Sequence, residues 1–407
     1  MLHPEEINIE DYNYHLPQEM IALRPLALRD ESRLIVYRNG EITTGSYANI
    51  APLLPGNSTL VFNDTRVVNA RIVFKKESGA KIEVFCLEPT SAAAGFEKVF
   101  SSTGSSEWKC FVGGASKWKG GDLELKLNHK NKELTLRATL KEKRDGYYIL
   151  LFSWTPDHLP FGEVIQLAGS VPLPPYIKRE AEESDRVRYQ TLFAKNEGSV
   201  AAPTAALHFT DNIIHDLSQA AIGMENITLH VGAGTFRPVN ADKLAGHEMH
   251  AEWIDVPLKT IESIADKEFI VPVGTTSLRT LESMYWMGVK IMRGDHHLHI
   301  SQWEVYNDVN ENCNVPVKSA YESLTAWMRS KGMERLFTQT SILIAPGYKM
   351  RVAKALITNF HQPKSTLLLL VASAIGDDWK SVYTYALEHN FRFLSYGDGS
   401  LLFFPQG

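Results

Sequence analysis

Histidine and carboxylate side chains are concentrated in one short segment that contains His247, Glu248, His250 and Glu252. Zinc proteases place two histidines four residues apart on one helical face. Here the two histidines are three apart and a strand is expected to follow, so the spacing disfavours a metalloprotease. Titratable groups this close could still exchange protons with a substrate, because histidine has the side-chain pKa nearest to neutral pH. The alternative is a structural role, with the histidines held by buried hydrogen bonds.

Three loops carry small hydroxyl, amide and imidazole side chains: 202–209 (APTAALHF), 274–279 (GTTSLR) and 358–361 (TNFH). One such loop is typical of a helix cap, whereas three at successive strand ends predict one wall of a pocket. The chain has no GxSxG elbow, no GxxxxGKS loop and no paired-carboxylate signature. Hydrolases and nucleoside triphosphatases are therefore disfavoured.

A glycine turn, Gly232-Ala233-Gly234, follows the apolar stretch ITLH. A dinucleotide or methyltransferase turn would open a helix whose N-terminus holds the ligand. Pro238 interrupts an immediate helix, which disfavours both of these folds. Glycines that let a ligand lie against the backbone remain an alternative.

These groups need strands and helices that hold them in place. Beyond Val171, we expect a series of short strands that each lead into a polar or glycine-bearing loop. Thr210 is expected to cap one helix, and Ser365 to cap another that ends at Gly376. The pattern predicts a mixed α/β fold with its ligand site at the strand ends. The expected strand segments are ITLHVGAG, FIVPVGTT, SILIAPG, ALITNFH and FRFLSYGD.

Residues 71–170 have a different pattern. LELKLN, ELTLRATL and YYILLF alternate apolar and polar residues between glycine-rich turns. This predicts a small antiparallel β domain inserted into the larger domain formed by residues 1–70 and 171–407. From Lys98 to Arg144 the net charge is +6. Those basic side chains fit either a solvated strand face or a nucleic-acid surface.

The composition excludes several classes of protein. The 407 residues are 44% hydrophobic and 22% charged, with a formal net charge of −5, which is typical of a two-domain globular protein and not of one that is basic throughout. Three cysteines without a CxxC pair exclude a disulfide framework and a thiolate zinc site. The longest strongly apolar run, Leu367 to Ile375, is shorter than the ~20 residues of a membrane helix. No signal peptide is evident, so we expect a cytoplasmic protein.

Residues 286–336 form a separate excursion in the expected fold. They contain the cluster HHLH, with His296, His297 and His299, and an expected helix, VKSAYESLTAWMRSKG. A surface excursion, a partner site and a metal clip are all compatible with this composition.

A series of longer strings runs along almost the whole chain and resembles the S-adenosylmethionine:tRNA ribosyltransferase-isomerases, in the order of that family. Strings such as TNFHQPKSTL and AAPTAALHF are long and non-degenerate, so the resemblance is specific. The strings are VFNDTRV (61–67), SVPLPPYIKR (170–179), RYQTLFA (188–194), SVAAPTAALHF (199–209), TLHVGAGTFRPV (228–239), HEMHAE (247–252), VGTTSLRTLES (273–283), APGY (345–348), LITNFHQPKSTLLLLVASAIG (356–376) and FRFLSYGD (391–398).

The resemblance implies an unusual use of S-adenosylmethionine. Members of the family transfer and isomerise its ribosyl group onto an aminomethyl-deazaguanine at the tRNA wobble position, which gives epoxyqueuosine and releases adenine and methionine. The implied fold is a larger α/β domain built around a β-barrel with surrounding helices, plus a small β domain. S-adenosylmethionine is then a cosubstrate, tRNA carrying the queuosine precursor is the partner, and no metal, membrane or obligate protein partner is implied.

This chemistry needs several acid–base groups in one site. The sulfonium acidifies the C5′ protons, but a positioned base must remove one, and the departing adenine needs a proton donor. Among the segments that resemble the family, the catalytic candidates are His208, His250, Glu252, His361 and Asp398, with His208 or His250 preferred as the base. The candidates for holding cofactor and substrate are Thr204, His230, Gly232, Gly234, Thr276, Arg279, Asn359 and Tyr396. Arg279 is a candidate clamp for the methionyl carboxylate, and Lys117 and Lys119 are candidates for tRNA phosphate.

Two positions of the larger domain depart from the usual pattern of the family, and residues 112–117 of the small domain carry fewer basic groups than is usual there. Ala206 stands where glycine is usual, so its methyl group could crowd a ligand, and Gly399 stands where alanine is usual. The alternative function is therefore a catalytically silent paralogue that binds tRNA or S-adenosylmethionine.

Overall fold

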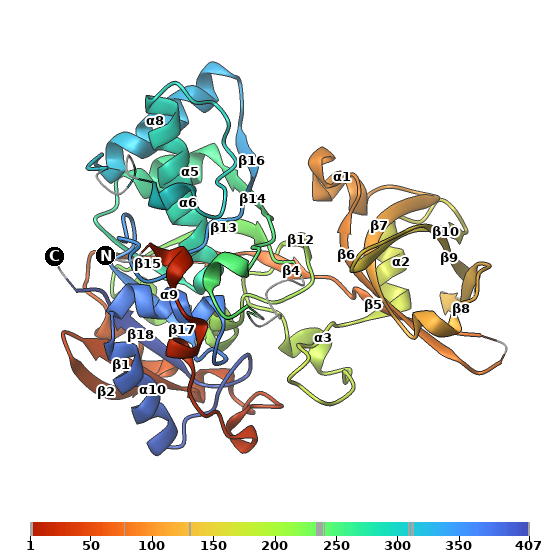
Figure 1. Ribbon diagram of the computed structural model, residues 1–407, viewed down its shortest axis with the longest axis horizontal. Coiled ribbons are helices and arrows are strands. Elements are labelled where there is room, and N and C mark those ends of the chain that lie inside the picture. Colours follow the sequence, from red (N-terminus) through yellow and green to blue (C-terminus); the bar gives the residue numbers. More distant parts are fainter. Residues whose placement is uncertain are drawn as a thin grey trace.

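The computed structural model contains two bodies of unequal size that lie side by side. In Figure 1 the larger body holds both ends of the chain, and the strand pair β4 (Thr65–Val67) and β12 (Asn196–Ser199) lies between it and the smaller body. The described residues are 3–76, 78–129, 132–232, 239, 241–307, 310 and 313–405.

A nine-stranded sheet forms the centre of the larger body, in the order β16-β14-β13-β3-β15-β17-β18-β1-β2. The neighbours β13, β3, β15 and β17 are parallel, and every residue of β3 is buried, as is usual for strands covered on both faces. The bounds are β1 (Arg33–Arg38), β2 (Glu41–Ser46), β3 (Ser58–Asn63), β13 (Gly223–His230), β14 (Glu252–Pro257), β15 (Phe269–Val273), β16 (Arg335–Thr340), β17 (Ala355–Asn359) and β18 (Gly399–Phe403).

This sheet is open. A barrel closes only when its first and last strands pair, and β16 and β2 are not joined by any ladder in the described part of the chain. The mixed α/β class is confirmed, whereas the closed barrel that the resemblance implied is not found in these residues.

The helices of the larger body begin where their caps predict. Thr210 Oγ1 accepts the amide of Ile213 at 3.5 Å, and Ser365 Oγ accepts that of Leu368 at 3.2 Å. Gly376, with φ of 64°, ends the second of these helices, so both predicted caps are confirmed. The bounds are α3 (Asp185–Arg188), α4 (Asp211–Gln219), α5 (Leu258–Ala265), α6 (Thr275–Met292), α8 (Val317–Ser330), α9 (Thr366–Ile375) and α10 (Asp378–Glu388).

Two segments that were expected to be strands are loops. Residues 341–347 and 391–398 belong to no named strand. In the first, the amides of Ile342 and Ala345 donate to side-chain hydroxyls, and those of Ser341 and Leu343 reach backbone carbonyls of a segment, 300–302, that is itself not a strand. In the second, the Arg392 amide donates to the Asp398 carboxylate at 2.9 Å, and the Asp398 amide donates to the Arg392 carbonyl oxygen at 2.8 Å. A segment that bonds to itself in this way turns back and cannot extend.

The smaller body is an antiparallel sheet in the order β11-β5-β6-β7-β10-β9-β8. It has a hydrophobic core of its own, in which Trp108 and Phe152 pack against Phe161 of α2. The three alternating segments of the sequence are strands β8, β9 and β10, as predicted. The bounds are β5 (Arg71–Lys75), β6 (Lys81–Pro89), α1 (Phe96–Phe100), β7 (Ser105–Gly113), β8 (Leu123–His129), β9 (Lys132–Arg144), β10 (Tyr147–Thr155), α2 (Phe161–Ala168) and β11 (Gly169–Ser170).

Much of the stretch 286–336 belongs to the main core rather than to a surface excursion. The predicted helix is α8, and its residues Ala320, Leu324 and Met328 are buried in the cluster that also contains α6. Gly288 of α6 permits this packing, because a Cβ there would lie 2.0 Å from the Ala320 carbonyl oxygen. The described residues hold no group of three or more His, Cys, Asp or Glu side chains suited to a metal ion. No helix among them is long and apolar enough to cross a membrane.

Candidate functional site

A hollow of about 110 Å³ lies at the carboxyl ends of the parallel strands β13, β15 and β17. The three small polar loops of the sequence meet here, since Thr204, Thr276, Asn359 and His361 all line the hollow. They arrive from separate elements because parallel neighbours end at the same edge of a sheet.

A short chain of hydrogen bonds runs from the hollow into the protein. Thr204 Oγ1 donates to Asn359 Oδ1 at 2.7 Å, and Asn359 Nδ2 lies 3.5 Å from His208 Nε2. His208 Nδ1 lies 3.3 Å from the Arg29 carbonyl oxygen, which assigns the proton to Nδ1 and leaves Nε2 to accept from Asn359. Burial lowers the pKa of His208 to about 4, so its imidazole is neutral at pH 7.

His361 lies in the wall of the hollow itself. Its Nε2 is 2.9 Å from Thr358 Oγ1, and its amide donates to the Tyr383 hydroxyl at 3.0 Å. Burial lowers the pKa of His361 to about 3. A neutral imidazole held in this way can accept a proton from a bound substrate.

The first turn of α6 forms another part of the wall, through Gly274, Thr275 and Thr276. Gly274 has φ of 91°, which favours glycine, and no side chain caps this helix. The uncapped amides and the helix dipole give this side of the hollow a partial positive charge. Asn63 Nδ2 supports the turn by donating to Thr276 Oγ1 at 3.3 Å.

Two tyrosines complete the wall, Tyr176 and Tyr189. The Tyr176 hydroxyl is 2.5 Å from Ser395 Oγ, and burial raises the pKa of Tyr176 to about 12. Neither tyrosine is predicted as a site residue from the sequence, because a buried tyrosine in an apolar context is usually a core residue. Their only signal was their place inside the strings SVPLPPYIKR and RYQTLFA.

Several predicted residues lie outside the hollow. Arg279 forms a buried ion pair with Glu252 and donates from Nε to the Ile342 carbonyl oxygen at 3.1 Å. The carboxylate that Arg279 clamps in this structure is therefore that of Glu252, and neither residue lines the hollow. His250, two residues before Glu252, is exposed.

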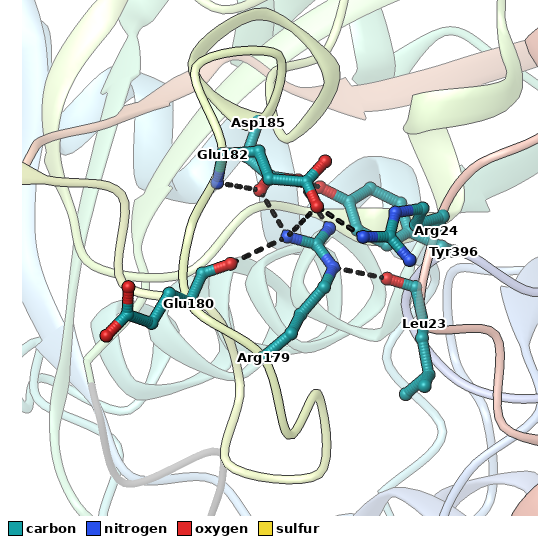
Figure 2. A network of polar contacts seen from close by, with 7 residues as sticks. All are labelled: Leu23, Arg24, Arg179, Glu180, Glu182, Asp185 and Tyr396. Atoms are coloured by element: carbon teal, nitrogen blue, oxygen red, sulfur yellow. Dashed lines mark hydrogen bonds and ion pairs between the residues drawn. The ribbon is translucent and has the colours of Figure 1, made fainter.

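Asp398 and Tyr396 hold the loop 391–398 in place. Besides the Arg392 amide, Asp398 accepts the Arg33 amide at 2.9 Å, so its carboxylate is occupied by the protein. The Tyr396 hydroxyl donates to Asp185 at 2.8 Å. Figure 2 shows that the same Asp185 carboxylate receives two bonds from Arg179, at 2.6 and 2.8 Å.

His230 lies beneath the strand pair that leads to the smaller body. Its ring stacks on Phe96 with centroids 4.2 Å apart, and its Nδ1 is 3.2 Å from Thr65 Oγ1. Burial lowers the pKa of His230 to about 3. Gly232 ends this part of the described chain, and a Cβ there would meet no atom of the described residues within 4 Å. Gly234 lies outside the described residues.

Part of the basic segment of the smaller body is paired internally. Lys109, Arg137 and Arg144 form ion pairs with carboxylates of nearby strand residues. Lys117 and Lys119 are exposed where the chain passes from β7 to β8. Both side chains are therefore accessible to a phosphate as well as to solvent.

The two departures from the family pattern pack together near His208. Ala206 is buried in the hydrophobic cluster that contains Tyr47 and does not line the hollow, so its methyl group does not crowd that space. Gly399 makes room for the Tyr47 hydroxyl, because a Cβ at 399 would lie 2.2 Å from it. The Tyr47 ring in turn contacts His208, with centroids 4.4 Å apart.

A ligand hollow at the ends of parallel strands, together with acid–base side chains, is compatible with an enzyme of nucleoside chemistry, and sequence comparison defines the class. The chain belongs to the family of queuosine biosynthesis proteins, whose model matches residues 9–402. The S-adenosylmethionine:tRNA ribosyltransferase-isomerase of Geotalea uraniireducens (strain Rf4) is 34% identical over 408 residues, covering 98% of this chain and 100% of that protein. The enzyme of the same name from Chelativorans sp. (strain BNC1) is 36% identical over 410 residues, covering 98% and 99%.

One solved structure is also similar. The S-adenosylmethionine tRNA ribosyltransferase of Thermotoga maritima is 26% identical, covers 96% of this chain and 99% of its own, and superposes with a TM-score of 0.45.

Proposed function

We propose that this protein transfers and isomerises the ribosyl group of S-adenosylmethionine onto the aminomethyl-deazaguanine of a tRNA wobble position. The products would be epoxyqueuosine-tRNA, adenine and methionine. The observation that carries the proposal is the match over nearly the full length to relatives named for this activity. The hollow supports it, because residues of three separate loops that resemble the family line one space.

The lining residues fit the cosubstrate by chemistry. The first turn of α6 would take the methionyl carboxylate, since helix N-termini favour anions and Arg279 is already paired with Glu252. Tyr176 and Tyr189 offer aromatic rings for the purine. When bound, S-adenosylmethionine supplies the ribosyl group and the acidity at C5′.

The acid–base roles follow from position. His361 lines the hollow and would accept the proton. His208 would act as a positioning residue, because it meets the hollow through Asn359. No metal is needed in this scheme.

The two bodies would have different roles, catalysis in the larger one and tRNA contact in the smaller one. We assign catalysis to residues 1–70 and 171–407 and treat residues 71–170, with their separate sheet and core, as an inserted domain. Lys117 and Lys119 of this domain would contact tRNA phosphate. A tRNA-modifying enzyme of this kind would work in the cytoplasm.

A product assay tests the proposal. Incubation of the purified protein with S-adenosylmethionine and tRNA bearing the precursor base should release adenine and methionine in equal amounts. Saturable binding without either product would favour a silent paralogue, provided that an active relative turns over in the same assay. Release of S-adenosylhomocysteine would indicate a methyltransferase and contradict the proposal.

A further inference from the structure

Two arginines that are far apart in the sequence, Arg29 and Arg188, lie beside His208. Each donates hydrogen bonds to backbone carbonyl oxygens within three residues of the other. Arg29 donates from Nη1 to the Gln190 carbonyl oxygen at 3.2 Å and from Nη2 to that of Val187 at 3.5 Å. Arg188 donates in the opposite direction, from Nη1 to the Ala27 carbonyl oxygen at 3.2 Å and from Nη2 to that of Leu26. The two guanidinium groups are therefore held close to each other.

Neither charge is neutralised by a carboxylate in the described part of the chain. Arginines nearby do have such partners: Arg33 pairs with Asp398, and Arg179 with Asp185. Arg29 and Arg188 bond only to carbonyl oxygens, and each uses two of its five N–H groups in the described contacts. Burial and the neighbouring Arg188 lower the pKa of Arg29, the change expected of two cations held together.

One donor of this pair is unsatisfied. The Nε of Arg188 is buried and has no hydrogen-bond partner among the described residues. Buried donors in native proteins are nearly always paired, so an unpaired one next to an uncompensated charge points to a missing acceptor. A small anion would supply this acceptor and compensate the charge of both arginines.

Both arginines line a second, smaller hollow of about 10 Å³, together with His208 and Tyr396. This hollow shares a wall with the larger one. Tyr189 lines the larger hollow and Arg188 the smaller, and Ser395 lines the larger and Tyr396 the smaller. An anion in the smaller hollow would therefore be separated from the proposed reaction site by about one layer of side chains.

The rim of the smaller hollow is open to a large partner. Leu28 and Val187, each next in sequence to one of the two arginines, are 59% and 69% exposed. The hollow has space for about one water-sized group, so it does not suit the whole cosubstrate. A single phosphate oxygen of a larger molecule fits both observations.

We propose that Arg29 and Arg188 form a binding site for one phosphodiester of the tRNA substrate, adjacent to the nucleotide whose base enters the larger hollow. The inference rests on the proposed function. Guanidinium groups match the planar, bidentate geometry of phosphate oxygens better than ammonium groups do. A contact of this kind fixes the position of the nucleic acid without reading its sequence.

Salt-dependent tRNA binding tests the site. For Arg29→Gln and Arg188→Gln, the slope of log affinity against log salt should fall by about one per lost phosphate contact. Arg29→Lys keeps the charge and should retain most of the slope. A loss of slope in Arg29→Gln but not in Arg29→Lys would then be due to the lost charge, whereas an equal loss in both would indicate a folding defect. Arg329→Gln is the matched control, because Arg329 is an exposed α8 residue paired with Glu262, and its slope should equal that of the wild type.

The carboxylate of S-adenosylmethionine is the other possible source of the anion, and a second measurement separates the two. Affinity for S-adenosylmethionine and for its decarboxylated analogue should be unchanged in Arg29→Gln if the site holds tRNA phosphate. Weaker binding of S-adenosylmethionine alone, with an unchanged salt slope, would overturn the proposal in favour of the carboxylate. An unchanged slope in both glutamine variants of an enzyme that still releases adenine would reject the phosphate site while leaving the proposed function intact.

Discussion

At the scale of single residues, burial keeps two histidines at or near the hollow neutral. His361 lines the hollow and His208 contacts it through Asn359, so we propose different roles for two similar side chains. His250 is exposed and outside it. Position relative to the hollow therefore separates these candidates, which their residue type alone does not.

Replacement of His361 tests the role of proton acceptor. His361→Gln keeps an amide nitrogen near Thr358 but removes the base, so turnover should fall on the order of 10²–10⁴-fold. His250→Gln is the control, and it should retain nearly full turnover because its side chain is exposed. Release of adenine under saturating substrates measures both. Full activity of His361→Gln would contradict the role.

The same histidine should make stability depend on pH. In the unfolded chain histidine has a pKa near 6.5, whereas burial holds that of His361 at about 3. The unfolded state therefore binds more protons between these values, and stability present above pH 6.5 is lost as the pH falls towards 3. Urea unfolding at a series of pH values should show a shallower fall for His361→Gln than for wild type, by up to about 1.4 kcal/mol per pH unit. An identical slope would show that His361 titrates alike in both states.

At the scale of elements, β18 and the segment that carries Tyr47 meet in one tight contact. Gly399 is the first residue of β18, and its missing side chain leaves space for the Tyr47 hydroxyl. That hydroxyl is buried without a hydrogen-bond partner among the described residues. Because the Tyr47 ring contacts His208, the fit of these two elements also sets the position of the imidazole.

A double-mutant cycle tests this contact. Gly399→Ala should destabilise the protein by about 1–3 kcal/mol, because overpacking a rigid core forces its neighbours to move. Tyr47→Phe alone should cost little, since the hydroxyl it removes has no partner among the described residues. The two changes together should be less destabilising than their sum, because the closest clash disappears. If the changes in unfolding free energy of the two single variants simply add in the double variant, the Cβ at 399 does not clash with the Tyr47 hydroxyl.

At the scale of the whole molecule, two surfaces are proposed to meet the tRNA, one on each body. Arg29 and Arg188 belong to the larger body, and Lys117 and Lys119 to the smaller one, which Figure 1 places to the side. Each phosphate contact adds to the salt dependence of binding, so the contributions of separate surfaces should add.

Charge reversal on the smaller body tests how much this body contributes to tRNA binding. Lys117→Glu with Lys119→Glu should weaken tRNA affinity and lower the salt slope by about two, one for each lost contact. Turnover with saturating tRNA should change little, because neither residue lies near the hollow. Arg144→Glu, at a position already paired with Glu142, serves as a control for charge on the same body. A slope equal to that of wild type would show that neither lysine contacts tRNA phosphate, and that both belong to a solvated strand face.

The sequence by itself determined those features that depend on local interactions. Alternation of apolar and polar residues specified β8, β9 and β10, and the hydroxyls of Thr210 and Ser365 specified two helix starts. These predictions succeeded because a strand face and a helix cap are formed by residues close together in the chain.

Only the tertiary structure decided how distant polar groups are paired. Arg279 pairs with Glu252, and Asp398 holds its own loop in place, because buried charges are stable only when they meet partners, whichever segment brings those partners near. The hydrogen bonds of Arg29 and Arg188 join segments about 160 residues apart, and no local pattern specifies them. The charge that these two arginines leave uncompensated likewise became visible only once the carboxylates around them were located.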